Sequence, residues 1–104
     1  MVGKYDAVVQ CRAPAKEVYD FLSSGAKTTM KVKSTDPGTR KVSLKSKVGF
    51  FSYGEIVDCT VTGTIDGCRV DLHGRPVLAT NITADVKGTV TKVQTALVAE
   101  FGNR

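Results

Sequence analysis

The stretch that decides the fold is residues 83–101, TADVKGTVTKVQTALVAEF, near the end of the chain. Its large apolar residues are spaced four, three, four and four positions apart, which places them on one face of an α-helix. They are Val86, Val90, Val93, Leu97 and Phe101. Thr83 is suited to cap the start of this helix, and Asp85 lies where the helix dipole favours a negative charge. We therefore predict a long amphipathic helix.

The same stretch also has features of a strand. Gly88 lowers helix stability by about 1 kcal/mol relative to alanine, and several of the residues from 89 to 95 are β-branched threonines and valines. A sixth strand is therefore the alternative. We favour the helix, because an edge strand would not bury five apolar residues at this spacing.

Upstream, a short strand and a short helix are predicted. Residues 5–12 alternate in polarity, with Cys11 on the apolar face, which is typical of a half-buried strand. Pro14 suits the first turn of a helix, and Gly25 suits its left-handed end. Three apolar residues between them form one stripe: Val18, Phe21 and Leu22.

Four further segments alternate in polarity and are predicted to be strands: residues 30–35, 40–51, 55–65 and 68–73. The first two are joined by Asp36-Pro37-Gly38-Thr39, in which we expect Gly38 to take a positive φ. The last two are joined by Asp66-Gly67, which predicts a type I′ turn. Alternation along the third segment directs Val57, Cys59, Val61 and Ile65 inward and Ile56 outward.

These elements predict an α+β fold of order βαββββα, in which a curved antiparallel sheet wraps around a long C-terminal helix. The 104 residues suit one domain, spanning 1–104. Apolar residues make up 41% of the chain, but no stretch approaches the ~20 apolar residues that span a bilayer. The first 15 residues lack the apolar region of a signal peptide, and the three cysteines do not suggest a disulfide framework. We expect a cytoplasmic protein.

The segment that starts the first helix, Ala13-Pro14-Ala15-Lys16-Glu17-Val18-Tyr19-Asp20-Phe21-Leu22, resembles the helix-grip superfamily. That superfamily contains START domains, polyketide cyclases and Bet v 1-like proteins. The turn Asp36-Pro37-Gly38-Thr39-Arg40 is similar to its short hairpins. The chain would be an unusually short member, and the same trimmed order is found in one half of the TATA-binding protein.

The resemblance implies a space between the sheet and the last helix that can hold a small apolar ligand. Our leading hypothesis is a non-enzymatic protein that binds such a ligand and needs no cofactor. The candidate lining consists of apolar residues expected on the inner surfaces: Val18, Leu44, Phe50, Val61, Val70, Val93 and Leu97.

Positive charge is concentrated in residues 27–47, which carry seven basic residues and one acid in a chain of net charge +5. Alternation places five lysines on the outer face of the predicted hairpin: Lys31, Lys33, Lys41, Lys45 and Lys47. An alternative function is therefore a binding module for nucleic acid or another polyanion. The other interpretation is that these lysines solvate the sheet and block its edge. A third hypothesis is an oligomer that pairs through a sheet edge.

Enzymatic activity has the least support. His73 is the sole histidine, and the sequence places Asp71 and Arg69 on its face without a nucleophile. One histidine without adjacent cysteines cannot form a zinc site, so we expect no metal. We expect Cys59 and Cys68 to lie too far apart to form a disulfide.

Overall fold

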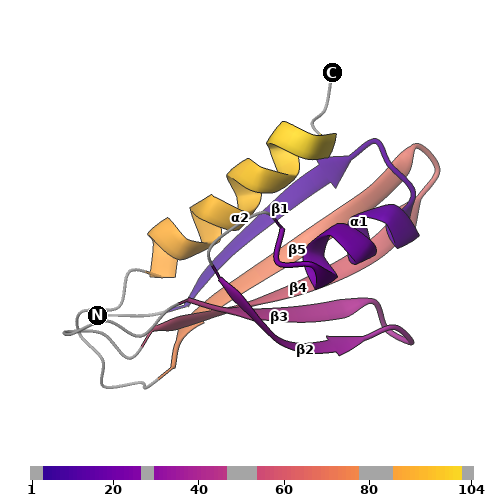
Figure 1. The fold of residues 1–104 in the computed structure, drawn as a ribbon. Helices are drawn as coiled ribbons and strands as arrows, with labels where there is room; N and C mark the ends of the chain where they lie inside the picture. The colour runs from indigo at the N-terminus through magenta and orange to yellow at the C-terminus, as the bar shows by residue number, and fades with distance from the viewer. Residues whose placement is uncertain (1–3, 27–29, 47–53, 78–85, 102–104) are drawn as a thin grey trace.

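In the computed structural model, which describes residues 4–26, 30–46, 54–77 and 86–101, the chain forms five strands and two helices (Figure 1). In chain order the elements are β1 (Tyr5–Cys11), α1 (Ala15–Ser23), β2 (Lys31–Asp36), β3 (Lys41–Lys45), β4 (Glu55–Thr64), β5 (Gly67–Pro76) and α2 (Val86–Phe101). The predicted βαββββα order is confirmed, and residues 86–101 of the deciding stretch form a helix rather than a sixth strand. Thr83, Asp85 and the end of the predicted strand 40–51 lie outside the described residues.

The strands form a single antiparallel sheet in the order β1-β5-β4-β3-β2, so β1 and β2 are its edges. The register aligns residues of like character, because Val9 lies opposite Val70 and Val70 lies opposite Val61. These inner-face side chains are buried and belong to one hydrophobic cluster with residues of both helices. The period-two pattern of the sequence therefore predicts the inner face of the central strands correctly.

Both helices pack on the inner face of the sheet (Figure 1). α2 lies along β1 and β5, whereas α1 lies over β3 and β4. The two helices meet through Phe21 and Phe101, whose rings pack edge to face with centroids 5.1 Å apart. The backbone N–H of Arg12 donates to the carbonyl of Phe101 at 3.3 Å, which ties the end of α2 to the end of β1. Neither described helix is long and apolar enough to cross a membrane.

Gly74 of β5 allows α2 to lie very close to the sheet. A Cβ at this position would be 2.3 Å from Cγ2 of Val90 and 2.9 Å from Cγ1 of Val86. Both valines are buried, and they belong to the helical stripe predicted from the sequence. The close approach of α2 therefore depends on a strand residue without a side chain.

The conformations of two turns differ from the predictions. In the β2–β3 hairpin the left-handed residue is Arg40, with φ 53°, and not Gly38. Asp36 and Lys41 pair across the hairpin, so the loop has four residues and Arg40 is the last of them. The Asp36 carboxylate accepts N–H bonds from Gly38 at 3.0 Å and Thr39 at 3.4 Å. The start of this turn is therefore stabilised by hydrogen bonds to the Asp36 carboxylate, and not by a positive φ at Gly38.

In the β4–β5 hairpin, Thr64 pairs with Gly67, so the turn residues are Ile65 and Asp66 rather than Asp66 and Gly67. Neither turn residue has a positive φ, so the predicted type I′ turn is wrong. Ile65, predicted to point inward, is fully exposed at the tip. Gly67 has φ 153°, and a Cβ there would be 2.1 Å from the carbonyl oxygen of Cys11. The close contact with β1 therefore explains why residue 67 is a glycine.

Two apolar side chains have an exposure opposite to the prediction. Alternation along residues 30–35 and 40–51 predicts Val32 on the buried face with Val42 and Leu44. Val32 is instead exposed, because β2 is the edge strand farthest from α2, and its register shifts between Val32 and Ser34. Ile56 was expected on the outer face and is buried. It lies between Lys45 and Arg75 in the register, where the aliphatic stems of these long side chains can cover it.

Candidate functional site

The structure brings together the described residues of the predicted ligand lining. They come from both helices and three strands, each is at most 3% exposed, and all belong to the central cluster: Val18, Leu44, Val61, Val70, Val93 and Leu97. Phe50, the remaining member, lies outside the described residues. The six residues contribute to one closely packed interior, so the middle of the space beneath α2 is filled by the protein's own side chains.

At one end of this interior lies a carboxylate that the sequence analysis did not select. Glu55, the first residue of β4, is only 6% exposed. Its carboxylate accepts hydrogen bonds from the Thr89 hydroxyl of α2 at 2.5 Å and from the Ser46 hydroxyl at 3.1 Å. Ser46 Oγ in turn accepts the backbone N–H of Glu55 at 2.7 Å. We call Glu55, Ser46 and Thr89 the polar cluster.

The polar cluster borders the apolar contact between sheet and helix. Alternation along β4 places Glu55 on the same face as Val57, and Val57 lies opposite Gly74, the glycine on which α2 packs. Glu55 therefore lies on the inner face, where a charged side chain is rare unless it is hydrogen-bonded. The alternation that places Val57 inward also places Glu55 inward, so the sequence contains a signal for this residue.

Two surface hollows are lined by residues outside the polar cluster. One, of about 870 Å³, is formed by the end of β1 and the tip of the β4–β5 hairpin, and Cys11, Arg12 and Ile65 are among its lining residues. The other, of about 500 Å³, lies on α2 and is lined in part by Lys87, Gly88 and Lys92. Neither hollow is lined by a residue of the predicted ligand site.

The basic hairpin is exposed, as the charge pattern predicts. Lys31 and Lys45 lie directly opposite each other in the β2–β3 register and therefore share a face. Lys33 falls where that register shifts, and Lys41 lies opposite Asp36. In the described part of the chain, Lys31, Lys33 and Lys45 form no ion pair. Lys47 lies outside the described residues.

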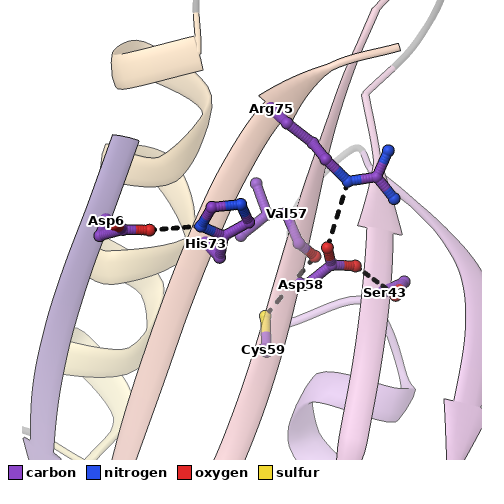
Figure 2. A network of polar contacts seen from close by, with 7 residues as sticks. All are labelled: Asp6, Ser43, Val57, Asp58, Cys59, His73 and Arg75. Carbon is purple, nitrogen blue, oxygen red and sulfur yellow. Dashed lines mark hydrogen bonds and ion pairs between the residues drawn. The ribbon is translucent and has the colours of Figure 1, made fainter. Parts of the chain in front are cut away.

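A polar network occupies the outer face of the sheet, opposite the helices. Figure 2 shows Asp58 of β4 between its two partners, the Ser43 hydroxyl at 2.6 Å and the Arg75 Nε at 3.3 Å. The ring of His73 points toward Asp6, and its Nδ1 hydrogen-bonds to that carboxylate across the β1–β5 pair (Figure 2). The network therefore links β1 to β5 and β3 to β4 and β5.

Among the described residues, the outer network does not bring a nucleophile to His73. Within the described ranges, no serine or cysteine hydrogen-bonds to His73, and the Ser43 hydroxyl is bonded to Asp58 instead. Asp71 and Arg69, predicted beside His73, pair with each other at 3.2 Å. The Asp6 partner was missed because it lies on another strand and depends on the β1–β5 register. The described residues contain no group of three or more histidine, cysteine or acidic side chains that could hold a metal ion.

The cysteines are buried on the inner face. Cys59 lies opposite Leu72, and its thiol donates weakly to the carbonyl of Val57 at 3.9 Å (Figure 2). Burial raises the pKa of the Cys59 thiol to about 12, with a further contribution from Asp58. Cys68, in contrast, lies opposite Cys11 across the β1–β5 pair, a neighbour that the sequence analysis did not consider.

No model of a known protein family matches the sequence, and no curated protein matches it either. Solved structures are similar to it in fold. A protein from Nitrosospira multiformis superimposes with a TM-score of 0.66 at 13% identity, over 94% of this chain and 95% of that one. A member of the major latex protein family from Arabidopsis thaliana gives a TM-score of 0.69 at 10% identity, over 95% of this chain and 91% of that one. The chain therefore has the Bet v 1-like, helix-grip fold.

Proposed function

We propose that this helix-grip chain is a non-enzymatic binding protein that holds a small ligand between its sheet and α2, with Glu55 as the polar contact. The observation that carries the proposal is the buried Glu55 carboxylate on the inner face. Binding sites in proteins are mostly apolar, with a few polar groups that orient the ligand. The polar cluster at the margin of an apolar interior fits that description.

The chemistry of Glu55 indicates which polar group the ligand would carry. An ionised carboxylate only accepts hydrogen bonds, and its two oxygens offer about four lone-pair sites. Thr89 and Ser46 donate hydrogen bonds that hold this carboxylate on the inner face. A ligand with a hydroxyl or ammonium donor is therefore favoured, whereas a ligand carboxylate would meet a like charge in a poorly solvated place.

Packing indicates where the ligand would lie. Because the six described lining residues already fill the middle of the interior, the proposed site lies at the end where β4 begins. The apolar part of the ligand would contact the inner-face residues next to the polar cluster, including Val57 and Val86. The residues of the predicted lining would then lie beneath the ligand and would not surround it.

The proposal is tested by fluorescence titration with three probes that share one ring system: 2-naphthol, 2-naphthylmethylamine and 2-naphthoate. We expect the alcohol and the amine to bind at least about tenfold more tightly than the carboxylate, because only they can donate to Glu55. In the Glu55→Gln variant, we expect the amine to bind no more tightly than the carboxylate. We expect the alcohol still to bind. Equal affinity for all three probes, or binding of none, would contradict the proposal.

A pair of threonine variants separates a polar contact from a general effect on α2. Thr89→Val removes the hydroxyl that holds Glu55, and Thr95→Val makes the same change at an exposed position on the same helix. We expect Thr89→Val to alter the affinity for 2-naphthol and Thr95→Val to leave it unchanged. Equal effects of the two variants would show that the hydroxyl of Thr89 has no role in binding.

A second candidate function is polyanion binding by the β2–β3 hairpin. The observation that favours it is the direct opposition of Lys31 and Lys45, since like charges facing each other across strands are destabilising. An anionic partner would relieve this repulsion. The lysines and the register shift on edge strand β2 also oppose pairing with another sheet, which disfavours the edge-paired oligomer.

Matched charge reversals test this second function. The triple variant Lys31→Glu, Lys33→Glu and Lys45→Glu is compared with Lys4→Glu, Lys87→Glu and Lys92→Glu, which changes the net charge equally. We expect the first variant to lose binding to heparin at low salt and the second to retain most of it. If both variants lose binding equally, net charge rather than the hairpin is responsible.

A further inference from the structure

Cys11 and Cys68 lie directly opposite each other at one end of the β1–β5 pair. Both side chains belong to the central cluster, with exposures of 4% and 0%. The thiols are close enough for each to affect the pKa of the other. Both cysteines are free thiols in this structure, so the pair is present in its reduced form.

The backbone geometry suits a covalent bond between them. Directly opposed residues of antiparallel strands have α-carbons about 4.5–5.5 Å apart, and disulfides span about 4.4–6.8 Å. Gly67, the neighbour of Cys68, packs against the backbone of Cys11, where a Cβ would be 2.1 Å from the carbonyl oxygen. The two strands are therefore close at this point, and the separation expected for opposed residues lies within the span of a disulfide.

A surface hollow lies next to Cys11. Cys11 is among the residues that border the hollow of about 870 Å³ between the end of β1 and the β4–β5 hairpin tip. Cys59 borders neither hollow, and it lies opposite Leu72 rather than another cysteine. The three cysteines are thus not equivalent, and the register singles out one pair.

We propose that Cys11 and Cys68 form a redox site, which a peroxide oxidises to an intramolecular disulfide that joins β1 to β5. The Cys11 thiolate attacks one peroxide oxygen; an S–O bond forms, the O–O bond breaks, and hydroxide leaves and takes up the thiol proton as water. The Cys68 sulfur then attacks the sulfenic sulfur; the S–S bond forms, the S–O bond breaks, and a second water leaves. Two thiols lose two electrons and two protons, and the peroxide gains them.

The environment of the pair makes this reaction slow. Burial raises the pKa of the Cys11 thiol to about 12, and the neighbouring Cys68 thiol adds to the rise. Burial also raises the pKa of Cys68 above its ordinary value. Because the thiolate is the nucleophile, the site responds to sustained rather than brief exposure to peroxide.

The disulfide would act on the element that supports α2. β1 is an edge strand that pairs with β5, and α2 lies along it. A bond between Cys11 and Cys68 fixes the end of β1 at the place where the Arg12 N–H holds the end of α2. Oxidation would therefore restrain the sheet edge and the helix together.

The test is peptide mapping after the wild-type chain is treated with hydrogen peroxide and alkylated under denaturing conditions. We expect one disulfide between Cys11 and Cys68, one alkylated cysteine, Cys59, and full recovery of three alkylated cysteines after treatment with dithiothreitol. Cys59→Ser should form the same disulfide, and Cys11→Ser should form none; Cys11→Ala replaces it if the serine variant does not fold. Three free thiols, sulfinic acids, a bond to Cys59 or a bond between two chains would each overturn the proposal.

Discussion

At the scale of single residues, Gly74 sets the distance between the sheet and α2. Its φ is not in the left-handed region, so alanine is compatible with the backbone, but a Cβ would lie 2.3 Å from Val90. We expect Gly74→Ala to lower the free energy of unfolding by about 1–3 kcal/mol, because α2 must shift to relieve the overlap. Urea denaturation followed by circular dichroism measures this change.

Gly63 provides the matched control for Gly74. It lies on the inner face of the neighbouring strand β4, and a Cβ there would be 4.0 Å from the Cβ of Ala15, which is an ordinary contact. We expect Gly63→Ala to leave stability unchanged or to raise it slightly, by up to about 1 kcal/mol. Equal destabilisation by the two variants would mean that α2 does not depend on close approach at Gly74.

The pKa of Cys11 predicts how the oxidation rate depends on pH. With a pKa raised to about 12, the thiolate fraction at neutral pH is far below saturation, and it grows about tenfold with each pH unit. The rate of disulfide formation in excess hydrogen peroxide should therefore rise about tenfold from pH 7 to pH 8. Quenched alkylation followed by mass spectrometry gives the rate. A rate independent of pH over this interval would contradict the buried environment assigned to Cys11.

At the scale of elements, the β2–β3 hairpin depends on the Asp36 carboxylate. Hydrogen bonds from Thr39 and Gly38 hold the pKa of Asp36 below its ordinary value of 3.8, with the Thr39 side chain as the largest cause. Because the folded pKa is lowered, the stabilisation is present above pH 3.8 and is lost as the pH falls through the folded pKa.

An NMR titration of the carboxyl groups measures the pKa of Asp36. The Asp36 midpoint should lie below 3.8 in the wild-type chain and move upward in Thr39→Val, which lacks the donating hydroxyl. Thr35→Val, on the same hairpin, is the control and should leave the midpoint unchanged. A midpoint unaffected by Thr39→Val would show that the hydroxyl does not hold the carboxylate.

Elements with a strong apolar period were predictable from the sequence, and turns were not. The spacing of Val86, Val90, Val93 and Leu97 outweighs the β-branched residues of α2, because burying one continuous face contributes more than local propensity disfavours. The β4–β5 turn was predicted one residue too late along the chain. Gly67 is required by its close contact with Cys11 on another strand, and not by the turn. Such a contact between distant segments leaves no local pattern.

In the candidate site, too, the residues that follow the apolar period were predictable, and the contacts between distant segments were not. Val70 and Val93 were recognised because burial follows from periodicity. Glu55 was missed because its acidic character suggests a strand end in solvent, although alternation assigns it to the inner face. The pairings of Asp6 with His73 and of Cys11 with Cys68 require the register of β1 against β5, which no local pattern specifies.

At the scale of the whole molecule, the disulfide between Cys11 and Cys68 would close a loop of more than half of the chain. In the chain-entropy model, closing a loop of about 60 residues stabilises the folded state by about 4 kcal/mol. We expect the oxidised protein to unfold at a markedly higher urea concentration than the reduced protein. Urea denaturation of the two forms measures this difference, and Cys68→Ala treated with peroxide is the control. Equal stability of the oxidised and reduced forms would mean that the bond strains the β1–β5 pair.

The proposed ligand position is tested most directly by nuclear Overhauser contacts between bound 2-naphthol and the labelled methyl groups of the protein. If the ligand binds between the sheet and α2, we expect contacts to the methyl group of Thr89 and to those of Val86 and Val57, beside the Glu55 carboxylate. Contacts confined to Ile65 at the hairpin tip, or to Val98 on the exposed side of α2, would place the probe on the surface and contradict binding between the sheet and the helix.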